Sequence, residues 1–242
     1  MSQPVLSVSG LAKTWRDGAR TLRIEVEALD LHPGEIRVMA APSGSGKSTV
    51  LDMLALALPP DRAERFALTL DGKPQDVTKT VLDGAEAERA RLRAALFAYV
   101  VQTVELIPFL RVREDIALQQ QVRGRGSMGA AQDLAEQLGI AECMDRMPGP
   151  LSVGQRQRAA LARAAACAPA ILLADEPTSA LDPELKAQVM RVFQEIAARG
   201  TSVLIVTHDT ELVRDLDLPL LDQRSEDLSD GWRTVFTDRV PA

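Results

Sequence analysis

Aromatic residues are scarce in this chain, making up 3% of its 242 residues, with two tryptophans and one tyrosine. A hydrophobic core must therefore be built from leucine, valine, isoleucine, alanine and methionine, and a hydrophobic content of 46% is ample for that. At this length the chain can hold one large α/β domain. Each aromatic side chain is rare enough to be considered individually.

Positive charge is also in short supply. The chain has 28 lysines and arginines against 34 aspartates and glutamates, for a formal net charge of −6. A protein that holds nucleic acid needs a basic face to neutralise the phosphates. We therefore expect no nucleic acid among its partners.

Cysteine is also scarce, with two residues in the chain, and long apolar runs are missing. Cys143 and Cys167 lie in stretches of helical composition, without a CxxC pair or a His/Cys cluster, and are predicted to be small buried apolar residues. No apolar run approaches the roughly 18 residues that span a bilayer, and the first residues do not resemble a signal peptide. We expect a soluble chain from a reducing compartment that is able to dock on a membrane protein.

The most informative stretch runs from Ala41 to Thr49 and reads A-P-S-G-S-G-K-S-T. An apolar run typical of a strand precedes it, and apolar residues at helical spacing follow. In this context the backbone N–H groups of a glycine-rich turn point at a phosphate chain, and the helix N-terminus adds partial positive charge. The predicted nucleotide-binding residues are Ser43, Gly44, Ser45, Gly46, Lys47, Ser48 and Thr49.

Within this loop, Lys47 is expected to reach the β- and γ-phosphates and Ser48 to bind Mg²⁺. One position departs from the pattern G-x-x-x-x-G-K-[ST], because Ala41 replaces the first glycine. Alanine is harmless there if the backbone is in an ordinary conformation, and it clashes if φ must be positive.

Hydrophobic periodicity predicts an alternation of strands and helices. Strands are predicted at 5–15, 22–31, 36–40, 66–70, 96–101, 170–176 and 201–207. Helices are predicted at 50–56, where Pro59 and Pro60 stop the helix, and at 85–95, 130–138, 156–168 and 185–199. The predicted fold class is α/β: a P-loop NTPase with a central, mainly parallel sheet, an N-terminal antiparallel β layer and an inserted helical subdomain.

We expect a single domain over residues 1–242. Its α/β core and β layer are assigned to 1–102 and 170–242, and the helical subdomain to 103–169. The region after His208 contains an acidic stretch at 216–222 and the segment 231–242, and neither matches a pattern that predicts a structure or a function.

Two acids and a histidine follow the predicted buried strands. Asp175 and Glu176 end one strand and His208 follows the next, at the edge where open α/β sheets bind ligands. Phosphoryl transfer to water needs charge neutralisation, a metal and an oriented water. Asp175 is therefore predicted to join the Mg²⁺ shell, and Glu176 to polarise the water as general base. His32 has no such neighbours and is predicted to be structural. His208 ends a strand in the same way as Asp175 and Glu176 do, so it is predicted to act with them.

These motifs, in this order, resemble those of ABC-type ATPase subunits, the nucleotide-binding domains that power ABC transporters, and the likeness covers nearly the whole chain. The matching segments are the P-loop 41–48, Gln102 as the Q-loop, L-S-V-G-Q at 151–155 as the signature, 172–176 as Walker B, 179–182 as the D-loop, and 207–209 with the switch histidine.

The resemblance implies a function for each segment. ATP and Mg²⁺ are the expected cofactors, with Ser48, Gln102 and Asp175 at the metal and Glu176, His208, Gln102 and Lys47 in catalysis. Two chains, identical or paralogous, are expected to pair head to tail on ATP. Ser152, Gly154 and Gln155 of one chain would then meet the γ-phosphate held by the other. Trp15, which by itself reads as an edge aromatic covering a sheet, falls where the family stacks adenine.

The segments 83–93, 106–110 and 114–117 look like those of the lipoprotein-releasing and macrolide-exporter branch. Members are bacterial and act with FtsX-type membrane subunits, so we expect a cytoplasmic protein, peripheral on the inner face of the membrane and bound to a membrane-embedded permease. The apolar segment 105–110 is either the docking surface for that permease or packing inside the helical subdomain, at about even odds. The alternative functions are a solute-importer ATPase and a weakly active regulatory ABC protein.

A second departure from the family pattern lies in the signature, where Val153 replaces the first glycine of Ser-Gly-Gly. A stiff branched side chain is then placed close to the partner's nucleotide. Together with Ala41 this suggests an active but slow ATPase, the alternative being neutral drift at tolerant positions.

Overall fold

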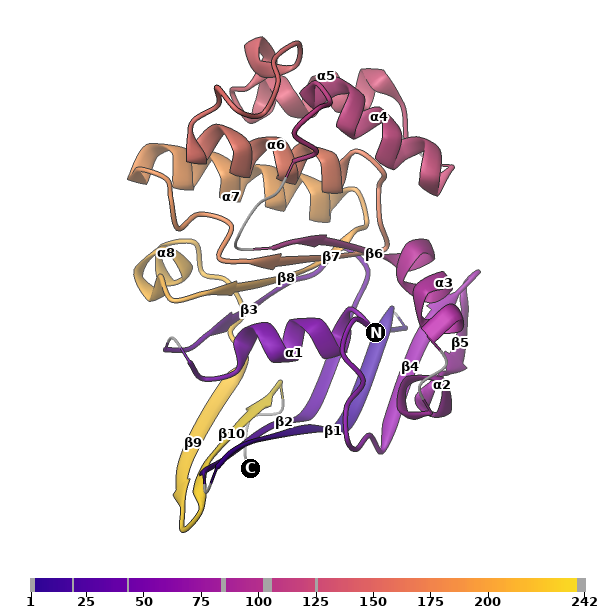
Figure 1. Cartoon of the computed structure of the whole chain (residues 1–242), viewed down its shortest axis with the longest axis vertical. Coiled ribbons are helices and arrows are strands. Elements are labelled where there is room, and N and C mark those ends of the chain that lie inside the picture. The colour runs from indigo at the N-terminus through magenta and orange to yellow at the C-terminus, as the bar shows by residue number, and fades with distance from the viewer. Residues whose placement is uncertain are drawn as a thin grey trace.

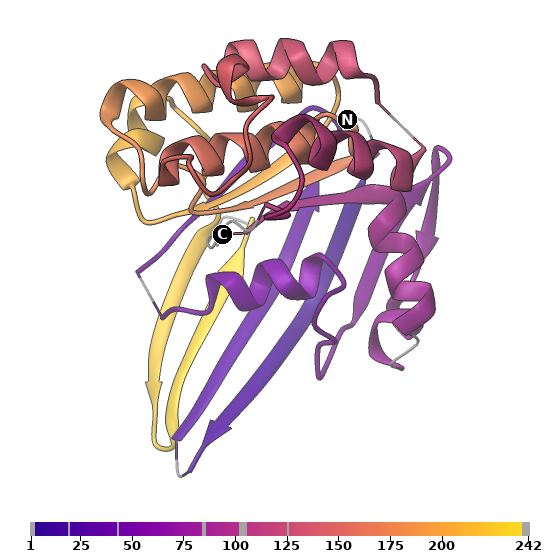
Figure 2. The same ribbon diagram turned by 45° about the horizontal axis from the view of Figure 1, so that its top comes forward.

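Two β-sheets with a helix between them form the framework of the protein (Figures 1 and 2). The computed structural model describes residues 3–18, 20–42, 44–83, 86–101, 106–124 and 126–238. Helix α1 (Lys47–Leu54) lies between the sheets, and its apolar residues pack with side chains from both. The predicted α/β P-loop fold is confirmed.

The central sheet is parallel and has the strand order β3 (Ile36–Ala40), β8 (Ser202–Thr207), β7 (Ile171–Asp175), β6 (Phe97–Val100). Strands from both ends of the sequence therefore meet in one sheet. Side chains alternate between its faces, as the pleat requires. Leu172 and Ala174 pack towards the helical layer, whereas Ile171 and Leu173 pack towards α1.

A helical layer covers the face of this sheet opposite α1 (Figure 1). Its members are α4 (Val112–Arg123), α5 (Met128–Gln137), the 3-10 turn η1 (Ala141–Cys143), α6 (Val153–Ala165) and α7 (Pro183–Ala198). Buried Asp115 pairs with Arg163 at 3.0 Å, which ties α4 to α6. Cys143 and Cys167 are buried free thiols, as predicted. Within the described residues, no helix combines the length and the apolarity that crossing a bilayer requires.

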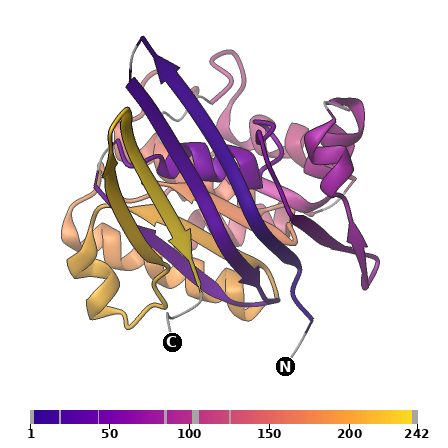
Figure 3. The ribbon, with the colours of Figure 1, turned by 90° about the horizontal axis from the view of Figure 1, so that it is seen from below.

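The second sheet has six strands, seen side by side in Figure 3: β5 (Lys73–Asp76), β4 (Arg65–Leu70), β1 (Leu6–Asp17), β2 (Arg20–Leu31), β10 (Gly231–Thr237) and β9 (Asp222–Leu228). The predicted antiparallel pair of the N-terminal layer is present as β1 and β2. The C-terminal hairpin β9–β10 was not predicted, and β10 runs parallel to β2.

The hairpin escaped prediction because its first strand, β9, has no apolar alternation. Strand β9 reads D-Q-R-S-E-D-L and is mostly exposed. Gly231, where β10 begins, has φ +151°, and a Cβ there would collide with the carbonyl oxygen of Thr21 in β2. The hairpin is therefore fixed by close backbone approach to β2, which is a tertiary contact.

The predicted helices differ from the observed ones by one to three residues at each end; α6, for example, begins at Val153 and not at Arg156, and α4 was not predicted. Helix α1 begins at Lys47 and ends at Leu54, and Leu56 already has φ +59°, so the chain leaves the helix before Pro59 and Pro60. Helix α7 begins earlier than predicted, because Asp182 caps it by accepting from the Leu185 amide at 3.0 Å. The remaining helices are α2 (Thr78–Leu82), α3 (Glu86–Leu96) and α8 (Thr210–Asp215).

Candidate nucleotide-binding and hydrolysis site

The glycine-rich loop joins the end of β3 to the start of α1, as the motif requires. Gly44 and Gly46 have φ of +81° and +92°, a backbone conformation that glycine adopts at little cost. A Cβ at Gly44 would meet open space, whereas one at Gly46 would collide with Ile24 of β2. Gly44 therefore leaves the backbone open to a ligand, and Gly46 lets the loop rest on the second sheet.

Ala41 carries no backbone strain. Of the residues described, five non-glycine residues have positive φ, and Ala41 is not among them. Its side chain is buried, and its carbonyl oxygen accepts a hydrogen bond from Lys47. Alanine is thus compatible with the loop conformation at this position.

The Lys47 ammonium group is held inside the loop. Its Nζ donates to the carbonyl oxygens of Ala41 at 2.7 Å and Pro42 at 2.9 Å, and the side chain is buried. A hollow of about 310 Å³ lies beside it, lined by Leu22, Gly44, Gly46, Lys47, Ser48, Thr49, Asp175 and Glu176. The structure thus gathers most of the predicted loop residues with both acids around one cavity.

Two oxygen ligands suited to a divalent cation lie together at this cavity. Ser48 Oγ donates to Asp175 Oδ2 at 2.7 Å. No group of three or more His, Cys, Asp or Glu side chains in the described part of the chain forms a metal cluster. A hydroxyl and one carboxylate fit Mg²⁺, which keeps several waters and completes its shell with substrate phosphates. Ser43 and Gln102 lie outside the described residues.

Burial raises the pKa of Asp175, and hydrogen bonding from Ser48 opposes that rise. The neighbouring Glu176 raises this pKa further, and Lys47 lowers it. Beneath the site, burial also raises the pKa of Asp52, whose carboxylate is hydrogen-bonded to Tyr99. Buried acids crowded in this way favour the arrival of positive charge, which would stabilise their ionised forms.

Glu176 is held in a strained backbone conformation, with φ +50°. Its amide donates to the Val206 carbonyl oxygen at 2.8 Å, and its own carbonyl accepts from Gln157 Nε2 at 2.8 Å. Such left-handed non-glycine residues cluster at functional sites, where surrounding contacts fix them. The bonds therefore aim the carboxylate from the end of β7.

His208 meets the same carboxylate. Its Nδ1 lies 2.9 Å from Glu176 Oε1, and the imidazole is more than half exposed. Thr207 Oγ1 donates to Glu176 Oε2 at 3.4 Å. Next to the histidine, Asp209 pairs with Lys186 of α7 at 2.6 Å. The predicted acid and histidine are thus side by side. His32 lies in the turn after β2, where its carbonyl accepts from Ser202 Oγ at 2.7 Å.

The signature residues form the N-terminus of α6. Ser152 Oγ accepts from the Gln155 amide at 3.1 Å, and Gln155 Oε1 accepts from the Ser152 amide at 2.9 Å, which makes a capping box. Ser152 keeps its hydroxyl hydrogen as a donor. A Cβ at Gly154 would lie 2.8 Å from Leu181 Cδ2, so this glycine packs against the D-loop. Val153 projects into solvent with 59% of its surface exposed.

Trp15 lies near the end of β1 and is 45% exposed. The Lys13 ammonium is 5.5 Å from its ring centroid, and Lys13 is itself fixed to Asp61 at 2.7 Å. One face of this ring is therefore occupied by a cation, in an arrangement that stabilises the ring position.

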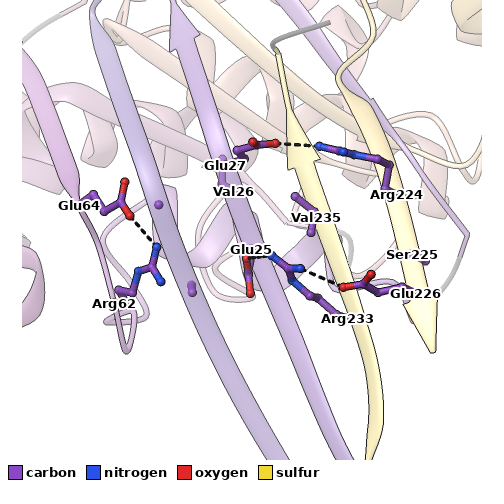
Figure 4. A pocket seen from close by; sticks show the side chains of 12 residues that line it. Glu25, Val26, Glu27, Arg62, Glu64, Arg224, Ser225, Glu226, Arg233 and Val235 are labelled. Carbon is purple, nitrogen blue, oxygen red and sulfur yellow. Dashed lines mark hydrogen bonds and ion pairs between the residues drawn. The ribbon is translucent and has the colours of Figure 1, made fainter. Parts of the chain in front are cut away.

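A larger hollow, about 540 Å³, lies on the opposite face of the second sheet (Figure 4). Its charges pair with each other: Arg233 with Glu25 and Glu226, Arg224 with Glu27, and Arg62 with Glu64. Their arginine charges are thus already neutralised within the hollow. The phosphate site is therefore the smaller cavity at the P-loop.

The sequence profile of the family described as "ABC transporter" matches residues 25–179, more than half of the chain. The chain belongs to the ABC transporter family. A second profile, described as "AAA domain, putative AbiEii toxin, Type IV TA system", matches residues 148–214 of this ABC ATPase. The family predicted from the motifs is confirmed.

Curated relatives include lipoprotein-releasing system ATP-binding proteins. LolD of Maricaulis maris is 36% identical, covering 100% of both chains, and LolD 2 of Caulobacter vibrioides is 35% identical, covering 90% of this chain and 93% of its own. The macrolide export ATP-binding/permease protein MacB of Agrobacterium fabrum is 32% identical over 96% of this chain and 34% of its own length. The predicted branch is confirmed.

Among solved structures, the dimeric cassette MJ0796 superposes with a TM-score of 0.73 at 27% identity, covering 96% of this chain and 94% of its own. The same cassette in a post-hydrolysis state with ADP and Pi superposes with a TM-score of 0.72 at 30% identity, covering 86% and 90%. This ABC ATPase is thus the ATP-binding, ATP-hydrolysing subunit of an ABC transporter.

Several residues at the site were not predicted. Leu22 lines the P-loop cavity from β2, Gln157 holds the Glu176 carbonyl, and Tyr99 bonds to Asp52. None lies in a recognisable motif, since each reaches the site by folding of a distant element. Asp182 is different, because Asp followed by Pro183 before an amphipathic run is a sequence signal for a helix cap.

The two departures from the family pattern are expected to differ in effect. Ala41→Gly should leave ATP turnover unchanged, because Ala41 has an ordinary backbone conformation. Val153→Gly should raise turnover about fivefold, the equivalent of about 1 kcal/mol of relieved crowding at the partner's nucleotide. Steady-state ATPase assays on both single variants and the double variant test this, and unchanged turnover in all three would refute the slow-site hypothesis.

Proposed function

We propose that this ATP-binding subunit dimerises head to tail on ATP and drives an FtsX-type membrane subunit, in the manner of a lipoprotein-releasing or exporting system. The observation behind the proposed dimer is the N-terminus of α6, where Ser152 and Val153 are exposed. A helix N-terminus of this kind binds anions. The phosphate of a second chain's nucleotide is a suitable occupant. The dimeric state of the cassette MJ0796 supports this proposal.

In the proposed reaction, Lys47 and the loop amides neutralise the β- and γ-phosphates. Glu176 accepts a proton from the attacking water, and His208, whose Nδ1 lies against that carboxylate, is proposed to hydrogen-bond the γ-phosphate. Mg²⁺ supplies charge neutralisation to the leaving phosphates when bound, and Ser48 and Asp175 are placed to hold it. Gln102, which follows β6 in sequence, is proposed to join the metal shell.

Mixed dimers test the head-to-tail arrangement. Lys47→Ala removes the P-loop charge and Ser152→Glu places a carboxylate at the signature, so each variant alone is expected to be inactive. Mixing them creates dimers in which one site combines an intact P-loop with an intact signature. We expect about a quarter of wild-type turnover at equal amounts, because half of the dimers are mixed and each has one intact site.

Absence of activity in the mixture would exclude the head-to-tail arrangement. If P-loop and signature of the same chain formed the site, no molecule in the mixture would contain both, and activity would stay at the level of the single variants. Mixing Lys47→Ala with Lys47→Ala,Ser152→Glu is the matched control, because no intact composite site arises in any pairing.

The docking surface for the membrane subunit is proposed at Phe109, between β6 and α4. Within the apolar segment 105–110, the two alternatives from the sequence apply to different residues. Leu106 is buried in the core, whereas Phe109 is 76% exposed. Glu105 lies outside the described residues. Phe109 is an exposed phenylalanine that offers apolar surface to a partner. The chain would then be peripheral on the inner face of the membrane.

Phe109→Asp should abolish stimulation of the ATPase by a co-reconstituted FtsX-type permease from the same organism and leave basal turnover unchanged. A charged residue in an apolar contact loses several kcal/mol of association, roughly a hundredfold or more in affinity. Val122→Asp is the matched control, since Val122 is 73% exposed at the far end of α4. Equal stimulation of both variants would exclude this docking surface.

A further inference from the structure

The only two tryptophans of the chain lie in one row across the second sheet. Trp15 of β1 is paired with Leu22 of β2, and Leu22 is paired on its other side with Trp232 of β10. Directly paired residues on neighbouring strands project from the same face of a sheet. The two indoles therefore stand on one face, one on each side of Leu22. Figure 3 shows the three strands side by side, with the yellow hairpin against β2.

That face is the one turned to the P-loop. Leu22 lines the cavity that contains Lys47 and Ser48. Trp232 lines an adjoining hollow of about 490 Å³, together with Pro42, Gly44 and Ser45. Gly44 lines both cavities, so the second hollow adjoins the phosphate site. The neighbouring residues Arg233 and Val235 of β10 face the other side of the sheet, where the charge-paired hollow lies.

The chemistry of the second hollow suits an uncharged ring. Its described lining residues include Asp227, which is paired with Trp232 across the hairpin, and no lysine or arginine, so a phosphate is disfavoured there. Trp232, 37% exposed, offers an apolar face, and Ser45 Oγ is buried without a hydrogen-bond partner. A nucleotide base has a flat apolar face and polar edges, which matches this lining.

We propose that Trp232 is a base-contacting residue of the ATP site, forming with Trp15 a slot that holds the base over Leu22. This inference rests on the proposed role of Trp15 as a stacking platform. Strands β1 and β10 are separated by two strand spacings, roughly 10 Å. Aromatic rings in contact have centroids about 4.5–7 Å apart, so a base between the two indoles touches both. Lys13 covers one face of the Trp15 ring, and the base would take the other.

Because the chain has two tryptophans, each can be observed alone. In Trp15→Phe the emission of Trp232 is the only indole signal, and in Trp232→Phe that of Trp15 is. We expect Mg·ATP to quench Trp232 emission saturably in Trp15→Phe, at the concentration where ATP binds. Inorganic tripolyphosphate, which has no base, should leave the emission unchanged while competing with ATP.

Affinity provides a second measurement. Trp232→Ala should weaken ATP binding about tenfold, at the lower end of base–aromatic stacking, and leave tripolyphosphate binding unchanged, while Trp232→Phe should largely restore ATP affinity. Equal loss of both ligands in Trp232→Ala would mean that the indole only supports the hairpin, and would overturn the proposal. Quenching of Trp15 but not of Trp232 by ATP would also overturn it, and would leave the proposed function intact. If neither indole responds and ATP does not bind, the proposed function itself fails.

Discussion

Glu176→Gln is expected to reduce ATP turnover by about a thousandfold, within the 10²–10⁴ range for loss of a general base. The amide keeps the shape of the side chain but cannot accept the proton of the attacking water. ATP binding should survive, because Lys47 and the loop amides are untouched. If ATP joins two chains and hydrolysis separates them, the variant should also accumulate as a dimer in ATP.

The measurement is steady-state ATPase activity beside size-exclusion chromatography in Mg·ATP, Mg·ADP and no nucleotide. Glu136→Gln is the matched control, since Glu136 is an exposed glutamate on α5 that contacts none of the site residues described above. Wild-type turnover in Glu176→Gln would exclude it as the base. If the variant is inactive but stays monomeric in ATP, the role of Glu176 as general base is supported and the ATP-dependent dimer is excluded.

Lys47→Ala is expected to lower both ATP affinity and turnover by about a hundredfold or more, since a positioned charge at the phosphates contributes 10²–10³ in rate. The variant also loses hydrogen bonds that hold the loop together. Lys47 Nζ bridges the carbonyl oxygens of Ala41 and Pro42, and both would lose this donor in the variant. The loop would then lose its preformed shape along with its charge.

Binding of a fluorescent ATP analogue and ATPase assays measure the two effects separately. Lys73→Ala, on exposed strand β5, controls for the loss of one positive charge from the molecule. Unchanged affinity in Lys47→Ala would show that the loop amides alone hold the phosphates. If Lys73→Ala lowers ATP affinity and turnover to the same extent, the loss comes from the change in the net charge of the molecule.

Much of the fold could be predicted from the sequence because its central strands are continuous apolar runs. The stretches 171–175 and 202–207 are buried on both faces, and only such runs suit a parallel sheet covered by helices. The hairpin β9–β10 could not be predicted, since the exposed strand β9 has no apolar face and Gly231 is required by the approach of Thr21. The start of α1 was misplaced by three residues, because Lys47 and Ser48 lie in the helix although neither belongs to its apolar stripe.

The sequence by itself determined the family and the candidate residues for binding phosphate. Their chemistry depends on residue type and on short spacing along the chain, as in the loop 41–49 and the Asp175–Glu176 pair. Residue type and short spacing can both be read directly from the sequence. Tertiary structure decided which distant groups share a site: Ser48 with Asp175, His208 with Glu176, and Trp15 with Trp232 across Leu22. These pairings depend on strand order and register, which arise only when separate segments pack together, and no local pattern encodes them.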